Sequence, residues 1–272
     1  MPELPEVETV ARGLDQRIAG DVIESVWLGA KPEPLKSSAQ EIADALDSKK
    51  ISRVHRMGKH IVFDLTSANG KNPSAQTQWI VHLGMTGSLR VCSPDATAEK
   101  HTHAVLRLAS GRELRFIDPR RFGRLSVIEN FEAPGAEPLQ ISVEEFAKLF
   151  RARKTPIKSA LLNQKLLSGV GNIYADEALF RAGIRPKRRA ASLNKDELRR
   201  LHSVLKKVLQ EAIRAGGSSI SDYVDSNGDE GFFQLKHRVY GREGKPCLKC
   251  KSLIKRIVIA GRSSHYCPHC QK

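Results

Sequence analysis

The chain has little cysteine, few aromatic residues and no long apolar run. Its 272 residues include five cysteines, which are too few for a disulfide framework in a protein of this size. No apolar stretch reaches the length of about 18 residues that a membrane-spanning helix requires. The first ten residues, MPELPEVETV, are acidic and do not combine a basic segment with an apolar one. We therefore expect no secretory signal, a cytoplasmic location and no membrane partner.

Negative charge is also scarce. Lysine and arginine total 45 against 30 aspartate and glutamate residues, so the formal net charge is +15 and the isoelectric point is near 9.8. A protein this basic usually has a polyanionic partner, and the excess is concentrated near the C-terminus. We predict a nucleic-acid partner. The alternative is a solvated surface on which the charge is merely scattered.

The first half of the chain is predicted to be rich in strands. Apolar residues recur at helical spacing over residues 5–18, and a short helix is expected there. Short β-rich runs then follow one another at intervals of about ten residues, which is typical of an antiparallel sandwich or barrel. The clearest of these runs cover residues 61–65, 79–83, 102–108 and 113–117, and residues 67–78 form a polar loop.

The second half is predicted to be helical. Two prolines and a glycine over residues 132–140 mark a domain boundary. Helical periods follow, and the segment 216–235, rich in Gly, Ser and Asp, is expected to be a loop. The fold class is therefore α+β with several domains: residues 1–135, 136–235 and 236–272. The candidate helices cover residues 143–150, 159–167, 173–182 and 194–215.

The tail carries two Cys-x-x-Cys pairs, at Cys247 and Cys250 and at Cys267 and Cys270. This spacing is a strong signal for one structural zinc ion. A tail of 37 residues buries too little apolar surface to fold alone, and zinc bound by four thiolates supplies the missing stability. Two disulfides or redox-active thiols are the alternative. Cys92 stands alone and is expected to be a packing residue.

The same tail is the most basic part of the chain. Residues 236–272 contain six lysines and four arginines but one acidic residue, Glu243. A zinc-stabilised hairpin with this charge is suited to binding a phosphate backbone.

A second phosphate site is predicted where two helices meet. Gly169 and Gly171 permit close approach of another backbone, and Asn172 is expected to be the N-cap of the following helix. The amide groups at a helix N-terminus bind phosphate. The alternative is an ordinary helical hairpin in which the glycines only permit tight packing. Basic residues lie nearby, at Arg151, Arg153, Lys154 and Lys158.

The amino terminus is a candidate reactive group. Removal of Met1 would expose Pro2 as a secondary amine, and an α-amino group is roughly 10–20% neutral at pH 7, unlike lysine. A neutral amine can attack an aldehyde-like carbon and form an iminium ion. Glu3 and Glu6 are candidate proton carriers. The alternative is an extended tip whose acidic residues cap a helix.

Several motifs together resemble the bacterial formamidopyrimidine-DNA glycosylases, which excise 8-oxoguanine. They span the whole chain in the order of that family, ending with the four cysteines. They are residues 2–8 (PELPEVE), 58–60 (GKH), 82–89 (HLGMTGSL), 118–123 (DPRRFG), 169–175 (GVGNIYA) and 239–242 (VYGR).

The resemblance implies a bifunctional glycosylase and lyase of base excision repair that acts on oxidised purines in duplex DNA. Pro2 would form the Schiff base, and Glu3 would be the general acid with Glu6 as a secondary acid. Lys59 would assist β-elimination and Arg262 δ-elimination. We expect a monomer in the bacterial cytosol or nucleoid. The implied fold is an eight-stranded β-sandwich, a helical domain with a helix–two-turns–helix element, and a zinc-finger hairpin.

The resemblance also implies how DNA is held. Met85, Arg120 and Phe122 would fill the gap left by the extruded nucleotide, and a loop over residues 216–233 would cover the damaged base. Further contacts with DNA are expected from His101, Arg120, Arg153, Lys158, Asn172 and Tyr240.

Two other interpretations remain. The endonuclease VIII branch shares this chemistry but prefers oxidised pyrimidines, and its tip usually has glycine where this chain has Leu4. A zinc-ribbon protein could bind nucleic acid without catalysis, but it would not need Glu3 beside a processed Pro2.

Overall fold

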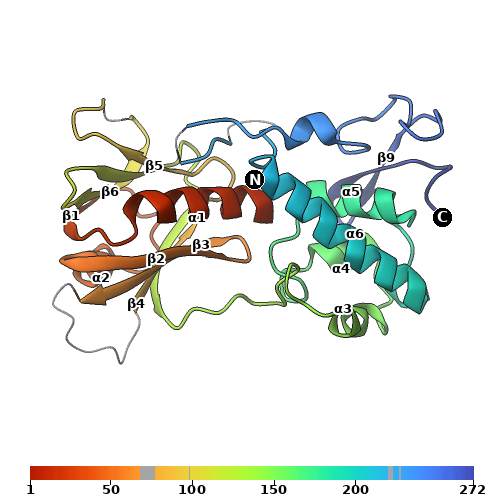
Figure 1. The fold of residues 1–272 in the computed structure, drawn as a ribbon, viewed down its shortest axis with the longest axis horizontal. Coiled ribbons are helices and arrows are strands. Elements are labelled where there is room, and N and C mark those ends of the chain that lie inside the picture. The colour runs from red at the N-terminus through yellow and green to blue at the C-terminus, as the bar shows by residue number, and fades with distance from the viewer. Residues whose placement is uncertain (68–76, 98, 220–222, 227) are drawn as a thin grey trace. The chain divides into compact units, whose positions relative to one another are not determined.

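The computed structural model describes residues 1–67, 77–97, 99–219, 223–226 and 228–272 (Figure 1). These residues form two compact units. Unit 1 comprises Met1–Glu132 and Gly216–Gly231, and unit 2 comprises Ala133–Ala215 and Phe232–Lys272. The polar loop predicted over residues 67–78 falls almost entirely outside the described residues.

The division differs from the predicted domains in two ways. The segment Gly216–Gly231 was predicted to belong with the helices, but it is part of unit 1. Its residue Ser218 bonds to Glu6 of the N-terminal helix. The cysteine-bearing tail clusters with the helices rather than standing apart. Its last residues bond to the end of a helix, because Lys272 N donates to Gly183 O at 3.0 Å.

In the described part of unit 1, eight strands form two antiparallel four-stranded sheets, as the resemblance implied. The strand orders are β1-β6-β7-β5 and β2-β3-β4-β8. The strands are β1 (Ile23–Leu28), β2 (Lys49–Met57), β3 (His60–Ser67), β4 (Thr77–His82), β5 (Ser88–Cys92), β6 (Thr102–Leu108), β7 (Glu113–Ile117) and β8 (Arg124–Glu129).

The core of unit 1 lies between the sheets and is completed by helix α1 (Leu4–Ile18), drawn in red in Figure 1. Val10, Leu14 and Ile18 repeat at helical spacing, so one face of α1 is buried against both sheets. Its first turn contains Pro5, which lacks the amide hydrogen that an early helical position leaves unbonded. This packing fixes the direction in which the N-terminus leaves the sandwich.

One further helix of unit 1, α2 (Ala39–Leu46), was not predicted. It is short, and only Ile42 and Leu46 of its residues are buried. Ser38 begins it with a capping box, in which the Ser38 hydroxyl accepts from Glu41 N and the Glu41 carboxylate accepts from Ser38 N.

Unit 2 contains helices α3 (Val143–Phe150), α4 (Ile157–Leu162), α5 (Asn172–Ala182) and α6 (Lys195–Arg214), two short 3-10 helices (Ala190–Ser192 and Phe233–Lys236), and strands β9 (Lys255–Ile259) and β10 (Arg262–Tyr266). Helix α4 ends five residues before its predicted end. The Gln164 side chain explains this, because its amide bonds to the backbone of Leu162, Gly169 and Val170 and stabilises a turn.

Strands β9 and β10 form an antiparallel hairpin in which Ile259 pairs with Arg262. Ala260 and Gly261 connect them with φ angles of +47° and +73°. Two positive φ angles are the signature of a tight hairpin turn, and they place Arg262 next to its tip.

No helix in the described part of the chain is long and apolar enough to cross a membrane.

Candidate catalytic and DNA-binding site

The N-terminal residues Pro2, Glu3 and Glu6 are all buried. Glu3 is the N-cap of α1, and its amide donates to Glu6 Oε2 at 2.8 Å. Glu6 is 2% exposed and uses its other oxygen, Oε1, to accept from Ser218 N at 2.7 Å. One carboxylate thus holds the backbone beside Pro2 and the backbone of a segment more than 200 positions later in the chain.

The contact between α1 and the segment Gly216–Gly231 is close. A Cβ added to Gly217 would lie 2.9 Å from Glu6 Oε1, and Gly217 adopts a φ of +82°. The Tyr223 hydroxyl donates towards Glu6 O and Gly216 O, at 3.3 and 3.1 Å. Burial, together with the charge of Glu6, raises the pKa of Tyr223, so the hydroxyl stays protonated and continues to donate.

Lys59 lies in the two-residue turn between β2 and β3, after Gly58 at a φ of +59°. Arg56 connects this turn to α1, because its Nε donates to Glu8 Oε2 at 2.8 Å and its Nη1 donates to Gly58 O at 3.0 Å. Burial alone would raise the pKa of Glu8, but Arg56 and Arg12 hold it below its usual value. The charged pair therefore fixes the turn that carries Lys59.

Two histidines that sequence reasoning did not single out lie near Lys59, His60 at the start of β3 and His82 opposite it at the end of β4. The rings of His60 and His82 are 5.1 Å apart. His82 Nδ1 accepts from Gly84 N at 3.2 Å, so this nitrogen carries no proton. Burial, assisted by His60, Arg124 and Lys59, lowers the pKa of His82 to about 4. His82 is therefore neutral at pH 7, and its place in the motif at residues 82–89 was the available signal.

The three predicted wedge residues lie on two loops that contact each other. Gly84 belongs to the Met85 loop, and a Cβ added there would lie 2.5 Å from the carbonyl carbon of Phe122. Met85 is half-buried, Phe122 is 52% exposed, and the Arg120 guanidinium lies 4.9 Å from the centre of the Phe122 ring. The structure therefore brings Met85, Arg120 and Phe122 together.

Asp118, which sequence reasoning also missed, holds these loops. Its Oδ1 accepts from the Thr86 hydroxyl at 2.5 Å and its Oδ2 accepts from Gly123 N at 2.7 Å, so it joins the Met85 loop to the Phe122 loop. Its own amide donates to His101 O at 2.9 Å, which fixes the backbone of a further predicted DNA contact. Asp118 is fully buried, whereas the His101 side chain is exposed.

In unit 2 the structure corrects two predictions. The N-cap of α5 is Gly171, and Asn172 is instead the first helical residue. Asn172 Oδ1 is buried and has no hydrogen-bond partner among the described residues. Lys158 was expected near DNA phosphates, but it is 0% exposed and its ammonium lies 2.7 Å from Asp176 Oδ1. Arg153, by contrast, is exposed as predicted.

The Lys158–Asp176 pair holds the zinc-finger hairpin. Lys158 Nζ donates to Ser263 O at 2.6 Å, and Asp176 Oδ2 accepts from His265 N at 2.8 Å. Both of these contacts lie on β10, the strand that begins at the exposed Arg262. A buried charged pair thus connects α4 and α5 to the strand that carries Arg262.

The neighbouring carboxylate, Glu177, holds the chain that enters the zinc finger. It is fully buried and accepts from the backbone amides of Arg238, Val239 and Tyr240, at 2.9 to 3.0 Å. The Tyr240 ring packs against His265 with ring centres 5.1 Å apart. Tyr240 is therefore half-buried and fixed against the hairpin.

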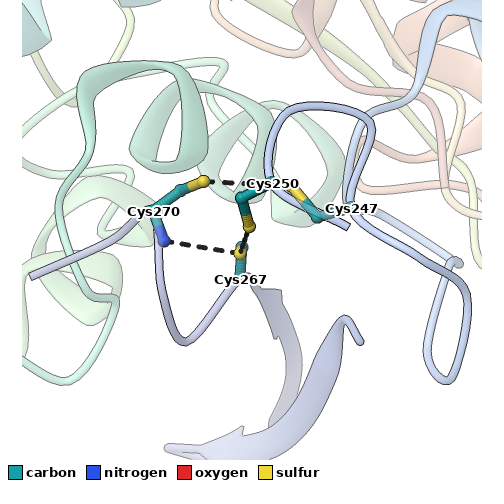
Figure 2. A group of neighbouring side chains, drawn as sticks. All are labelled: Cys247, Cys250, Cys267 and Cys270. Carbon is teal, nitrogen blue, oxygen red and sulfur yellow. Dashed lines mark hydrogen bonds between the residues drawn. The ribbon is translucent and has the colours of Figure 1, made fainter. Parts of the chain in front are cut away.

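The four cysteines of the two predicted pairs form a structural zinc site (Figure 2). Their sulfur atoms all lie within 4.8 Å of one another. Tetrahedral zinc with Zn–S bonds of about 2.3 Å separates its sulfur ligands by about 3.8 Å. The Sγ atoms of Cys247 and Cys270 are 3.9 Å apart, and those of Cys250 and Cys267 are 3.4 Å apart, so the four sulfurs fit around one ion. Cys267 N also donates to the fully buried Gln271, whose amide bonds to Ile184 O.

Comparison with known proteins gives the family. The formamidopyrimidine-DNA glycosylase N-terminal domain matches residues 1–125, the H2TH domain of the same enzymes matches residues 133–224, and a zinc finger found in FPG and IleRS matches residues 244–272. Together these models cover most of the chain. The chain belongs to the formamidopyrimidine-DNA glycosylase family.

Relatives of this family match the chain along its whole length. The formamidopyrimidine-DNA glycosylase of Solibacter usitatus is 47% identical and that of Desulfitobacterium hafniense is 43% identical, each with both chains fully covered. The Lactococcus lactis Fpg bound to DNA with an abasic site has a TM-score of 0.88 at 34% identity, with 99% of each chain covered. The wild-type form of that enzyme bound to DNA containing N7-benzyl-Fapy-dG also has a TM-score of 0.88, with both chains fully covered.

Proposed function

We propose that this formamidopyrimidine-DNA glycosylase removes 8-oxoguanine and formamidopyrimidines from duplex DNA and then cleaves the strand by β,δ-elimination. One observation carries the proposal. At the N-terminus of α1, the Glu6 carboxylate fixes the backbone beside Pro2, and the chain around it matches the family from end to end. The protein acts on DNA as a monomer in the cytosol or nucleoid.

Pro2 is the nucleophile once Met1 has been removed. Its nitrogen bonds to the deoxyribose C1′ while the bond from C1′ to the damaged base breaks. Glu3 donates a proton to the sugar ring oxygen as the ring opens, and the departing base takes up the proton that the Pro2 amine loses. The product is an iminium ion, which acts as an electron sink. Glu6 keeps Glu3 in place through the Glu3 amide, and it serves as a secondary acid.

Strand cleavage follows from the acidity that the iminium ion gives to the C2′ proton. Loss of this proton and of the 3′ phosphate is β-elimination, and Lys59 assists it from the turn that Arg56 fixes. Loss of the 5′ phosphate is δ-elimination, which Arg262 assists by stabilising the departing phosphate. Hydrolysis then releases Pro2 for another cycle.

The damaged nucleotide leaves the duplex before any of these steps, because C1′ is not accessible to the amine inside the stack. Met85, Arg120 and Phe122 fill the gap that it leaves. His101, Arg153, Asn172 and Tyr240 hold the DNA backbone on either side. The segment over residues 216–233 covers the damaged base. Lys158 acts in DNA binding only through the hairpin that it holds.

Sodium borohydride trapping tests the proposal, because it reduces an iminium ion to a permanent bond between protein and DNA. We expect trapping on duplex DNA that contains 8-oxoguanine, and none when a residue is retained before Pro2. Faster trapping on an oxidised pyrimidine would favour the endonuclease VIII interpretation. DNA binding without trapping would favour a non-catalytic zinc-ribbon protein.

A further inference from the structure

A basic cavity of about 640 Å³ lies in unit 2 at the C-terminal end of α5. It is bounded by α5, by α6 and by the zinc finger at Lys249 and Cys270. Its charged lining contains five cationic residues and one carboxylate. They are Arg181, Arg200, Lys207, Arg238, Lys249 and Glu211.

The single carboxylate neutralises only part of this charge. Arg181 Nη1 pairs with Glu211 at 2.6 Å, and Arg200 Nε donates to Ala182 O at 2.9 Å. Lys207, Arg238 and Lys249 are exposed, and none of them has a salt bridge within the described part of the chain. The formal charge of −2 on zinc and four thiolates still leaves the lining positive.

The cavity also has an apolar part. Phe180 is almost fully buried, and together with Ala182 and Val204 it lines the cavity beside the cations. A sugar–phosphate backbone supplies charge but no apolar side chain for such a surface. A peptide that combines carboxylates with an aromatic or large aliphatic residue matches both parts.

The cavity lies at the opposite end of α5 from the proposed DNA contact Asn172. A helix of 11 residues is about 16 Å long, so this distance separates Asn172 from the cavity at Gly183. The last residues of the zinc finger run alongside α5 towards its C-terminal end. Residue His265 of the finger bonds to Asp176 in the middle of α5, and Lys272 bonds to Gly183 at the end. Arg262 precedes His265 on β10, and it therefore lies away from the cavity.

We propose that this cavity is a docking site for an acidic peptide of a partner protein, with its carboxylates on Lys207, Arg238 and Lys249 and an apolar side chain against Val204 and the exposed edge of Phe180. The site lets DNA and the partner bind at the same time. Its existence does not depend on the catalytic roles proposed above. Its separation from DNA rests on the proposed contacts of Asn172 and Arg262 and on that of Tyr240, whose ring packs against His265 and does not line the cavity.

Fluorescence anisotropy of a labelled peptide, Asp-Asp-Glu-Asp-Leu-Phe with a free C-terminus, tests the proposal on the full-length zinc-loaded protein. We expect the Lys207→Ala/Lys249→Ala variant to bind this peptide roughly five- to tenfold more weakly than the unmodified protein. The matched control is Lys206→Ala/Arg199→Ala, which removes two positive charges from α6 outside the cavity. We expect this control to lose less than twofold.

Two further measurements separate the possible occupants. Protein saturated with duplex that carries a tetrahydrofuran in place of the abasic sugar, which lacks the C1′ oxygen that Pro2 would displace, should bind the peptide unchanged. A peptide ending in Gly-Gly should bind more weakly than the one ending in Leu-Phe. Displacement of the peptide by duplex would show that the cavity belongs to the DNA surface, and equal losses in both double variants would show charge attraction without a site. Either result would overturn the proposal, and both readouts are independent of glycosylase activity.

Discussion

Asp118 bonds to none of the groups proposed to react, yet its carboxylate joins the Met85 loop to the Phe122 loop. The Asp118→Asn substitution places an amide group where one carboxylate oxygen now accepts from Thr86 or from Gly123 N, so one donor faces another donor. We expect unfolding of unit 1 to become easier by about 2 kcal/mol. Excision of 8-oxoguanine from duplex DNA should slow roughly tenfold, because the wedge residues lose their alignment.

The Asp95→Asn variant is the control, since Asp95 is exposed on another loop of the same unit. Denaturant unfolding and single-turnover excision measure the two effects. Cleavage of an abasic site opposite a mismatch, which is already weakly stacked, should suffer less than excision from a paired duplex. Equal losses on the two substrates would contradict a role through the wedge.

His82 makes the stability of unit 1 depend on pH. Its pKa is about 4 in the folded protein and about 6.5 in an unfolded chain. Between these values the unfolded state binds more protons, so stability is fully present above pH 6.5 and is lost as the pH falls towards 4. The loss reaches about 3 kcal/mol at pH 4.

Urea unfolding of wild type and of His82→Gln between pH 4 and 7 measures this effect. Glutamine can still accept from Gly84 N but does not titrate, so the variant should lose less stability on acidification. His269→Gln, at an exposed position, should follow the wild type. A wild-type stability that is flat over this range would show that His82 titrates normally.

For single residues, the sequence predicts those whose chemistry depends on spacing. It does not predict the role of residues whose function depends on burial. The four zinc ligands follow from two Cys-x-x-Cys pairs. Lys158 looks like its basic neighbours in the sequence, and only the fold shows its ammonium facing the buried Asp176. Asp118 was visible inside a motif, but its contacts with Thr86 and His101 join distant parts of the sequence and leave no local pattern.

Among the elements, the hairpin of β9 and β10 depends on the charged pair behind it. In Asp176→Asn the fully buried Lys158 loses its counter-charge, while the amide oxygen can still accept from His265 N. We expect a loss of about 3–5 kcal/mol in the stability of unit 2. The double variant Asp176→Asn/Lys158→Met should recover most of it, because neither member of the pair is then charged. Thermal unfolding of both variants decides this, and the absence of recovery would argue against the charge as the cause.

The zinc site should be needed for the same hairpin. Chelation or Cys250→Ser should release the metal and unfold the tail that carries Arg262. The slope of log affinity for DNA against log salt should then fall by roughly 0.9 for each phosphate that the protein no longer neutralises. Cys92→Ser is the matched control, since Cys92 is a free thiol in unit 1. Metal analysis that finds no zinc in the active protein would refute this expectation.

Elements were predicted well where periodicity is strong. The strands over residues 102–108 and 113–117 and the helix over residues 143–150 agree with the structure at both ends. Helix α2 has only two buried residues, which is too few to establish a period. The end of α4 depends on the hydrogen bonds of one side chain, Gln164, and no propensity encodes them.

At the scale of the whole molecule, Gly217 connects a late segment to the N-terminus. In Gly217→Ala the added Cβ would meet Glu6 and displace the carboxylate that holds the Glu3 amide. Gly228→Ala is a matched control, because Gly228 also has a positive φ, of +91°, but a Cβ there would meet nothing within 4 Å. Both variants should lose about 1 kcal/mol of stability from backbone strain.

Only Gly217→Ala should slow borohydride trapping on abasic DNA, by roughly tenfold or more. The comparison of trapping rates between the two glycine variants measures the coupling between the segment and the amine. Equal rates would mean that Glu6 does not need its contact with Ser218.

The assignment of Gly216–Gly231 to unit 1 could not be predicted, because sequence order places the segment after α6 and its composition indicates only a loop. The contacts that decide its place join residues more than 200 positions apart. The sheet layers, by contrast, followed from the spacing of the strands and from the resemblance of the motifs.

The late position of Gly216–Gly231 also sets an order of events on the ribosome. The strands of the sandwich are complete once Glu129 has been synthesised, whereas the partner of Glu6 is made only after all the residues of α3 to α6. Nascent domains generally fold as their residues emerge. The sandwich is therefore expected to form first, before Ser218 is available to bond to Glu6. A chain released early by a stalled ribosome would hold the sheets but not the finished amine site. The amine site therefore reaches its finished form only in chains that have been translated past Ser218.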